Sequence, residues 1–467
     1  MLAQFSIVIP EILLASLAMI MQLLAIYLQK LNRQLYIITS LLALSLVAYL
    51  LYYNSGYQVG FGYSFASSEA ISLFKAIVLG LGLMSIVVYS DLVKILDKTY
   101  KTEFVTLILF STLGAFISIS ARDFILLFCG LELQALSGYA LAAFRTKSAK
   151  SSEAGLKYFI LGALMSGLML LGISLLYGYS GSIKFVEIKQ QFAADVVDIR
   201  LIIGAILVFA SILFKLSAAP MHIWTPDVYE GAPVSVVSYF AAAQKVAMLI
   251  VLINIIDGVL AGYHMISHDL VKIAAIISML IGSLGALKQD SLKRLMAYST
   301  ILNVGYVLVG VTLTSPDGNY AAFVYILIYS ISVMCFFSCL VALLGTKSDD
   351  VTFEDIQGVA SQRKTLAACI SIIMFSMIGL PPLAGFFGKY YLFLNAISEG
   401  EIVLALLGFI TSVIAAFYYL KVIKYMYFME PRGEIEVINT KSGLWLVTVV
   451  TLSFVLFFFM VAHKYIL

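Results

Sequence analysis

Four ionisable residues stand inside long apolar stretches of this 467-residue chain: Glu132, Lys215, Lys245 and Lys389. A charged side chain at the centre of a bilayer costs about 2.5–3.5 kcal/mol even on insertion scales, so such groups usually pair with each other or line a wet cavity. Carboxylates and amines in a shared cavity are also able to exchange protons. These residue types therefore indicate a path for ions or protons across a membrane.

The composition fixes the class of protein in which these residues must work. Hydrophobic residues make up 62% of the chain and charged residues only 12%, which is typical of a polytopic membrane protein and excludes a soluble domain. The expected surrounding is a lipid bilayer, and no nucleic-acid partner is expected.

An all-α fold with 14 transmembrane helices is predicted, because a helical span needs about 20 mostly apolar residues. The predicted spans lie near residues 5–26, 35–53, 71–93, 103–121, 123–144, 155–178, 200–226, 233–255, 269–287, 294–313, 320–344, 365–397, 402–428 and 443–462. With the N-terminus outside, 18 of the 29 lysines and arginines fall in inner loops, 6 in outer loops and 5 within spans. This bias follows the positive-inside rule and predicts that both termini face the outer, periplasmic side.

Two of the predicted spans are too long and too rich in proline to be ordinary helices. One carries Pro220 and Pro226 in its second half, and the other carries Pro381 and Pro382 in its middle. Proline removes a helical hydrogen bond, and the freed backbone groups are tolerated at membrane depth only beside protein or a water-filled cavity. Lys215 precedes the first break and Lys389 follows the second, so each break has its own lysine.

The two broken helices stand at similar places in two similar halves of the chain. A shift of 167 residues superposes Asp123 on Asp290, Gly138-Tyr139 on Gly305-Tyr306, Leu141 on Leu308, Tyr158 on Tyr325 and Gly178 on Gly345. Two five-helix repeats are predicted, and an odd number of spans in each makes the second inverted relative to the first. The expected domains are three N-terminal helices in 1–100, the repeats in 101–264 and 265–430, and a last helix in 431–467.

Polar residues at helical spacing extend the predicted path. Ser211, Lys215 and His222 are expected on one side of the seventh span, and Glu132 and Tyr139 share another face. A buried lysine tends to lose its proton, whereas a nearby carboxylate holds the proton on. Movement of Glu132 relative to Lys215 would therefore load or release a proton. His222 is either a relay in this path or a structural hydrogen-bonding group beside the proline break.

No cofactor or metal site is predicted in the chain itself. It contains no glycine-rich nucleotide loop, no iron–sulfur cysteine set and no convincing pair of haem ligands. The four cysteines, Cys129, Cys335, Cys339 and Cys369, lie in apolar helices and are expected to be buried packing residues.

Several phrases around these residues resemble a known family. They are GLELQALSGYAL (130–141), FKLSAAPMHIWTPDVYEGAP (214–233), QKVA (244–247), KRLMAYSTILNVGY (293–306) and GLPPLAGFFGKYYLF (379–393). They resemble the antiporter-like membrane subunits of bacterial proton-translocating NADH:quinone oxidoreductase, respiratory complex I, and among these the subunit N family. The resemblance covers the whole chain. It departs at 231–240, where a Thr-Pro expected near the start of the eighth span is missing.

The resemblance implies a role for each matched residue in proton translocation. Glu132 matches the carboxylate of the fifth span, Lys215 the lysine of the broken seventh, Lys245 the connecting lysine of the eighth, and Lys389 the terminal lysine of the broken twelfth. Lys157 matches a residue that assists proton uptake. The sister subunit M typically has a glutamate at the last position, so Lys389 favours subunit N.

The resemblance also implies partners and a location. FMN, iron–sulfur clusters, NADH and quinone are expected in partner subunits, and the neighbours are expected to be other membrane subunits of complex I, including sister antiporter-like subunits. The bacterial inner membrane is the expected location. The alternatives are a subunit of a multi-subunit Na+/H+ antiporter and a passive scaffold that links pump modules.

Simpler interpretations compete for the remaining ionisable residues. Lys75 and Lys157 lie within reach of a helix end, where a lysine can extend its ammonium group to the interface. Glu11 follows Pro10 near the outer end of the first span and is expected to be interfacial. The loop around residues 55–70 is rich in glycine and aromatic residues and is expected to form an ordered lateral contact.

Overall fold

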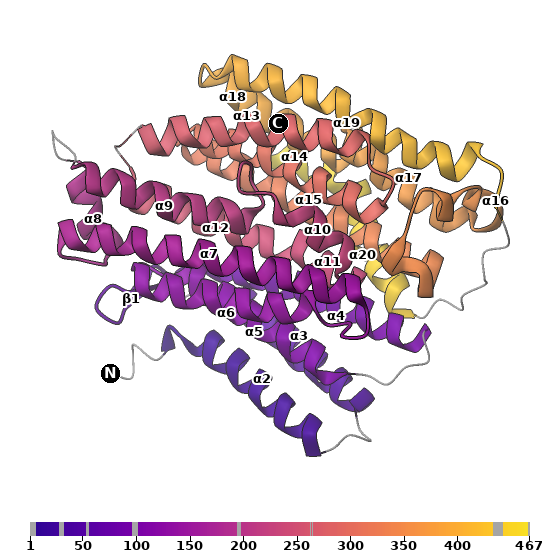
Figure 1. Ribbon diagram of the computed structural model, residues 1–467, viewed down its shortest axis with the longest axis horizontal. Helices are drawn as coiled ribbons and strands as arrows, with labels where there is room; N and C mark the ends of the chain where they lie inside the picture. The colour runs from indigo at the N-terminus through magenta and orange to yellow at the C-terminus, as the bar shows by residue number, and fades with distance from the viewer. Residues whose placement is uncertain are drawn as a thin grey trace. The chain divides into compact units, whose positions relative to one another are not determined.

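The computed structural model describes residues 6–27, 32–52, 56–95, 101–193, 198–261, 263, 265–432 and 442–465. These residues form helices almost throughout, with one short two-stranded hairpin (Figure 1). Lys30, Lys98 and Lys441, which contribute to the predicted orientation, lie outside the described residues.

The helices and strands follow one another as α2 (Ile9–Tyr27), α3 (Asn32–Tyr52), β1 (Gln58–Gly60), β2 (Phe65–Ser67), α4 (Glu69–Ile95), α5 (Thr102–Ser120), α6 (Phe124–Ala142), α7 (Ala149–Ser180), α8 (Phe185–Phe192), α9 (Ile199–Leu216), α10 (Trp224–Gly231), α11 (Val234–Ala241), α12 (Ala243–Gly258), η2 (Met265–Leu270), α13 (Val271–Leu287), α14 (Leu292–Thr312), α15 (Pro316–Leu344), η3 (Gly345–Asp350), η4 (Glu354–Ile356), α16 (Val359–Gln362), α17 (Lys364–Ile378), α18 (Ala384–Ser398), α19 (Ile402–Phe428) and α20 (Ser442–Tyr465).

The prediction of a mostly helical, polytopic membrane fold is confirmed. Among the described residues, 11 helical segments are long and apolar enough to cross a membrane. Three shorter apolar helices, Ile9–Leu24, Ile38–Leu50 and Lys364–Ile378, accompany them. The loop near residues 55–70 contains an antiparallel hairpin in which Gln58 pairs with Ser67 and Gly60 with Phe65.

The chain forms two compact units. Unit 1 comprises Met1–Ile86, Thr99–Leu216 and Ala243–Ser267, and unit 2 comprises Val87–Lys98, Ser217–Ala242 and His268–Leu467. In unit 1 the helices α6, α7 and α9 lie side by side (Figure 1). In unit 2, α14 packs against both α13 and α15.

Small residues allow the helices to pack closely within each unit. A Cβ atom added to Gly114 of α5 would lie 2.5 Å from the backbone N of Gln134 in α6. A Cβ atom added to Gly282 of α13 would lie 2.4 Å from the backbone N of Leu302 in α14. Helices in a bilayer gain most of their association energy from such contacts, so these glycines fix the helix pairs that carry the site.

Both predicted helix breaks are present. The helix α9 ends at Leu216, where Ser217 adopts a φ of 67°, and α10 begins at Trp224 after Pro220. The helix α17 ends at Ile378, Gly379 adopts a φ of 96°, and α18 begins at Ala384 after Pro381 and Pro382. A positive φ is costly for any residue with a side chain, which explains why glycine occupies the second turn.

A third interruption lies in the eighth span, which the sequence analysis treated as one helix over 233–255. The helix α11 ends at Ala241, and α12 begins at Ala243. Ala242 has φ −108° and ψ −79°, distorted from ideal helical values, although its N–H still donates to the Ser238 carbonyl oxygen at 3.2 Å. The Ala242 carbonyl oxygen accepts a hydrogen bond from Ser330 Oγ at 3.3 Å. A serine of α15 therefore satisfies a carbonyl group at this break.

Candidate functional site

The predicted acid and lysine of unit 1 form an ion pair between two helices. Glu132 Oε1 of α6 lies 3.5 Å from Lys215 Nζ in the last turn of α9. Lys215 Nζ also donates to the carbonyl oxygen of Leu131 at 3.3 Å. Ser166 of α7 donates its hydroxyl to Glu132 Oε1. Three neighbouring helices therefore hold one carboxylate and one ammonium group together.

The break after α9 explains how Lys245 joins this pair. In a continuous helix the carbonyl oxygen of Lys215 would accept from Ala219 N, but Ala219 N donates to Ser278 Oγ at 2.8 Å. Lys245 Nζ of α12 donates to the Lys215 carbonyl oxygen at 3.2 Å. Lys245 is fully buried. The two lysines are thus connected through a carbonyl group that the helix break leaves available.

A small cavity adjoins Lys215 in unit 1. Leu131, Gln134, Tyr158 and Gln244 line it together with Lys215. It offers about 10 Å³ to the centre of a water molecule, close to the minimum that one water needs. Gln244 Nε2 lies 3.5 Å from Ser111 Oγ, which adds a hydroxyl group near this space. The wall is polar enough to hold water beside the ammonium group.

Lys389 of α18 has a different shell in unit 2. Its Nζ donates to the carbonyl oxygens of Met377 at 2.9 Å and Ile378 at 3.1 Å, both at the end of α17. It also donates to Ser412 Oγ of α19 at 2.7 Å. An ammonium group has three hydrogens, and here each has a neutral oxygen acceptor. The ammonium group also lies 5.3 Å from the centre of the Tyr306 ring.

A polar network that the sequence did not predict lies beside Lys389. Tyr325 of α15 donates to Asn303 Oδ1 of α14, and Asn303 and Tyr325 line a small cavity together with Lys389. Asn303 Nδ2 donates to the carbonyl oxygen of Ser299 at 2.7 Å, and Ser299 Oγ lies 2.6 Å from Tyr419 OH. The signal was the run of Ser299, Thr300 and Asn303 in an apolar helix. Hydroxyl and amide groups of this kind can pass a proton between waters.

Lys157 has an acidic partner of its own, and His222 lies outside the helix that carries Lys215. Lys157 pairs with Glu153 at 2.8 Å on α7, and its side chain is 44% exposed. His222 belongs to the connection between α9 and α10 in unit 2, because the helix ends at Leu216. The expectation that His222 continues the helical face of Ser211 and Lys215 is wrong, since Ser217 turns the chain out of the helix.

Two further expectations fail in unit 1. Glu11 was expected to be interfacial, and extension to the interface was one alternative for Lys75, but the two form a buried ion pair at 2.6 Å with side chains 8% and 1% exposed. Cys129 was expected to be a buried packing residue, but it is exposed on α6, whereas the other three cysteines are buried. Among the residues described, no three His, Cys, Asp or Glu side chains gather as metal ligands would.

Comparison with known proteins gives a consistent family. The family described as "NADH:quinone oxidoreductase/Mrp antiporter, TM" matches residues 121–415. The chain is 49% identical to NADH-quinone oxidoreductase subunit N of Rickettsia prowazekii, over 96% of this chain and 98% of the relative.

Solved structures support the same fold. A chain of respiratory complex I from Thermus thermophilus is 27% identical, with a TM-score of 0.80 over 96% of this chain and 97% of that chain. A chain of the Mrp complex from Dietzia is 19% identical, with a TM-score of 0.79 over 97% of this chain and 95% of that chain, and shows the fold alone. The chain belongs to the subunit N family of NADH-quinone oxidoreductases.

Proposed function

We propose that this chain translocates protons through Glu132, Lys215, Lys245 and Lys389 as a subunit of a proton-translocating NADH:quinone oxidoreductase. The observation that carries the proposal is the contact of Lys245 Nζ with the carbonyl oxygen of Lys215, whose own ammonium group pairs with Glu132. An acid, a helix break and two lysines thus form one continuous polar cluster in an apolar unit. Such clusters in a membrane protein mark proton relays.

The first step takes place at the Glu132–Lys215 pair. While the carboxylate lies close, it stabilises the ammonium form of Lys215. When the two separate, burial favours release of the proton from Lys215 toward Lys245. Lys157, on the exposed face of α7 with Glu153, assists proton uptake from the cytoplasmic side. His222 is a candidate relay at the break between α9 and α10.

The last step takes place at Lys389. Its carbonyl and hydroxyl partners stabilise an ammonium group without a counter-charge, so a proton held there leaves when another positive charge approaches. Asn303, Tyr325 and Ser299 provide hydrogen-bonding groups beside it. Release occurs on the periplasmic side.

The transport unit consists of two inverted five-helix repeats, in residues 101–264 and 265–430. In the sequence, helices in 1–100 precede the repeats and a helix in 431–467 follows them. Two structural features recur 167 residues apart and support the repeat. Ser148 caps α7, and Ser315 caps α15. Tyr139 and Tyr158 form an edge-to-face ring pair, and so do Tyr306 and Tyr325. The 11 candidate spans and the three shorter apolar helices together form the proposed 14 transmembrane helices.

The driving reaction takes place in partner subunits. FMN, iron–sulfur clusters, NADH and quinone are bound there, and sister antiporter-like subunits lie alongside this chain. The complex occupies the bacterial inner membrane, with both termini of this chain on the periplasmic side. The relatives named as subunit N and the complex I structure support this context.

A substitution of Lys245 tests the path. Lys245→Ala removes the group that connects Lys215 to the rest of the cluster, so the proton-to-electron ratio of the purified complex in proteoliposomes should fall. Lys189→Met is the matched control, because Lys189 is a half-buried lysine of α8 whose ammonium group donates to the carbonyl oxygen of Asp257, outside the proposed path. A Lys245→Ala complex that pumps at the wild-type ratio would contradict the proposal.

The competing function is that of a subunit in a multi-subunit Na+/H+ antiporter. The likeness to the Mrp complex chain supports a shared fold. Purification of the full chain in mild detergent distinguishes the two functions. Flavin and iron–sulfur proteins should remain bound to this chain if it belongs to the oxidoreductase, and a preparation that transports sodium without them would favour the antiporter.

A further inference from the structure

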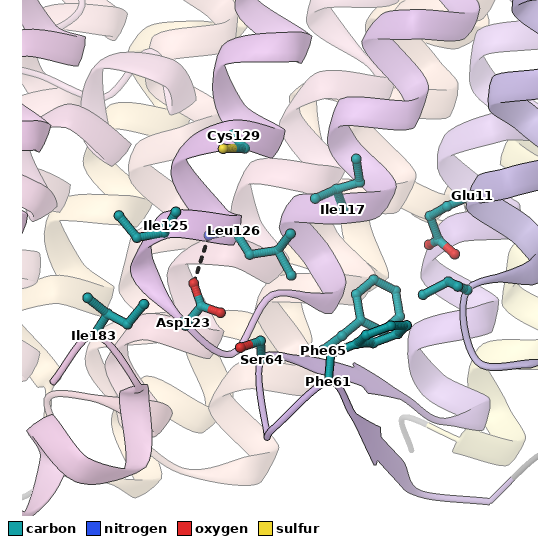
Figure 2. A pocket seen from close by; sticks show the side chains of 11 residues that line it. Glu11, Phe61, Ser64, Phe65, Ile117, Asp123, Ile125, Leu126, Cys129 and Ile183 are labelled. Atoms are coloured by element: carbon teal, nitrogen blue, oxygen red, sulfur yellow. Dashed lines mark hydrogen bonds between the residues drawn. The ribbon is translucent and has the colours of Figure 1, made fainter. Parts of the chain in front are cut away.

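A second site lies in unit 1, away from the ion pair of Glu132 and Lys215. It is a pocket of about 500 Å³ between α2 and α6, which we call the α2/α6 pocket (Figure 2). Its wall is almost wholly apolar and includes Phe61 of the hairpin, Ile117 of α5 and Leu126 of α6. The size and lining match those of small-molecule pockets, which are mostly apolar with a few polar groups that orient the ligand.

One of these polar groups is the carboxylate of Glu11, whose residue is only 7% exposed. Its Oε1 lies 2.6 Å from Lys75 Nζ, which also lies 5.1 Å from the centre of the Phe65 ring. Glu11 Oε2 has no hydrogen-bond donor among the described residues. A buried oxygen without a donor costs free energy, so a ligand that supplies an N–H group would be stabilised here.

A second carboxylate gives the pocket its charge preference. Asp123 caps α6 by accepting a hydrogen bond from Leu126 N at 2.7 Å, and it lines the same pocket as Glu11. Figure 2 shows Asp123 and Glu11 on opposite sides of Leu126 and Phe65. Lys75 balances one of the two acidic charges and does not line the pocket. The charge that remains favours a cationic group.

The residues around the pocket indicate a ligand with a polar end and an apolar chain. Tyr57 and Tyr63 in and beside the hairpin are each 69% exposed, as is typical of aromatic residues at the membrane interface. Both acids stand near the first turn of a helix, Glu11 in α2 and Asp123 at the cap of α6. Leu126 and the exposed Cys129 follow Asp123 along α6. The polar end of the pocket thus lies at a helix terminus, and its apolar wall continues along the helix.

We propose that the α2/α6 pocket binds a phospholipid whose head carries a primary ammonium group. The ammonium group donates to Glu11 Oε2, the charge of Asp123 elsewhere in the same pocket adds to the preference for a cation, and the upper part of one acyl chain lies against Ile117, Leu126 and Cys129. This site is independent of the proton path, since none of the four proton-carrying residues lines it.

Cys129 provides a direct measurement of occupancy. The full-length chain in its purified complex is delipidated in detergent, then mixed with phosphatidylethanolamine, phosphatidylcholine or phosphatidylglycerol. Alkylation of Cys129 by N-ethylmaleimide is followed by mass spectrometry, with buried Cys335 as the internal reference. The ethanolamine lipid should slow alkylation of Cys129 most, because only its head donates N–H groups to a carboxylate.

Two variants separate head recognition from chain binding. Asp123→Asn retains the helix cap but removes a charge, so the preference for the ethanolamine head should fall about tenfold. Leu126→Trp fills the apolar wall and should abolish protection by every lipid, whereas Ile160→Trp, at a 56% exposed position of α7 outside the pocket, should not.

Three results would overturn the proposal. Equal protection by all three lipids that Asp123→Asn leaves unchanged would show that no head group is recognised. Alkylation that no lipid slows would show an empty pocket. Protection of Cys129 in the delipidated complex, lost when the chain is separated from its neighbours, would show that a partner subunit covers the site.

Discussion

Lys215 of unit 1 and Lys389 of unit 2 have different kinds of partners. In unit 1, Lys215 has a carboxylate partner, Glu132, at 3.5 Å. In unit 2, the described partners of Lys389 are neutral oxygens from Met377, Ile378 and Ser412. The shift of 167 residues that superposes the repeats places Ser299 at the position of Glu132 and Ser412 at the position of Lys245. The two copies therefore share a framework but differ in where they carry charge.

This difference indicates a division of roles. A carboxylate that moves changes the charge balance of a lysine in one step, so the pair in unit 1 is suited to control when a proton is taken up. Fixed carbonyl dipoles hold an ammonium group with constant strength, so the shell in unit 2 is suited to a last site that responds to an arriving charge. The contact of Lys245 with the Lys215 carbonyl oxygen in unit 1 and the shell of Lys389 in unit 2 both depend on a broken helix, which supplies carbonyl groups without a helical partner.

The largest effect is expected at Lys389. Lys389→Met removes the ammonium group that Met377, Ile378 and Ser412 surround while retaining a chain of similar length, so this site can no longer take up a proton. Proton translocation through this chain should be lost, and the proton-to-electron ratio of the complex in proteoliposomes should fall. Lys421→Met, which alters a half-buried lysine that donates to the carbonyl oxygen of Gln289, is the control and should leave the ratio unchanged.

A smaller effect is expected when unit 1 is made to resemble unit 2. Glu132→Gln replaces the carboxylate by a neutral acceptor of the same shape, and the rate of coupled transport should fall about tenfold, as expected for the loss of a partly exposed ion pair. Glu132→Asp keeps the charge and should retain more of the rate. Equal rates for the wild type, Gln and Asp forms would show that the carboxylate does not control uptake.

The hydroxyl partners give a finer comparison. Ser412→Ala removes one of three acceptors from Lys389 and should lower the transport rate about fivefold, since a buried donor loses its partner. Ser166→Ala removes a donor from Glu132, which keeps Lys215 as its partner, and should lower the rate less than about twofold. A larger loss of transport rate for Ser166→Ala than for Ser412→Ala would contradict the proposal that Lys389 depends on neutral hydrogen-bond acceptors.

The sequence predicted those parts of the site that depend on costly residues. Pro220, Pro381 and Pro382 predicted the two broken helices. The contact between Glu132 and Lys215 was predicted because an unpaired charge in lipid costs free energy. The break at Ala242 gave no such signal, because alanine is the best helix former and Ser330, far along the chain, stabilises the open carbonyl group.

Partners that come from distant segments also escaped prediction. The oxygen shell of Lys389 consists largely of backbone groups, whose direction depends on how the chain turns at Gly379. The ion pair of Glu11 with Lys75 escaped because each residue stands near the start of its own helix, where an interfacial position is the ordinary expectation. Only the packing of α2 and α4 with the hairpin and α5 brings them into a buried site.

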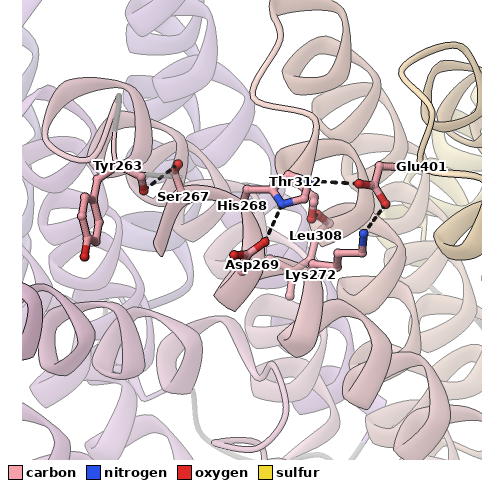
Figure 3. A network of polar contacts seen from close by, with 8 residues as sticks. All are labelled: Tyr263, Ser267, His268, Asp269, Lys272, Leu308, Thr312 and Glu401. Carbon is pink, nitrogen blue, oxygen red and sulfur yellow. Dashed lines mark hydrogen bonds and ion pairs between the residues drawn. The ribbon is translucent and has the colours of Figure 1, made fainter. Parts of the chain in front are cut away.

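A half-buried ion pair at the start of α19 in unit 2 serves as a reference for the pair of Glu132 with Lys215. Glu401, at the start of α19, contacts Lys272 Nζ at 2.6 Å and His268 Nε2 at 3.0 Å, and His268 Nδ1 lies 2.9 Å from Asp269 Oδ1 (Figure 3). Burial raises the pKa of Glu401, but the hydrogen bonds and charges of Lys272 and His268 outweigh it, so its pKa lies below the usual 4.5.

The smallest effect is therefore expected from Glu401→Gln. A carboxyl group with a lowered pKa in the folded state adds stability that is present above the unfolded pKa and is lost as the pH falls through the folded pKa. The wild-type chain should lose thermal stability on acidification below about pH 4.5, and Glu401→Gln should lose less, with a difference near neutral pH of under about 1 kcal/mol, the range found for ion pairs that water reaches. Thermal unfolding of the two forms in detergent between pH 7 and 3 measures this, with the exposed neighbour Glu399→Gln as the control. The Glu401 side chain is 16% exposed and that of Glu132 is 23% exposed, so burial alone does not distinguish the two acids. A weak effect of Glu401→Gln on stability and no effect on the transport rate, beside a tenfold loss of rate for Glu132→Gln, would show that only the Glu132 pair takes part in transport; equal losses of rate would remove that distinction.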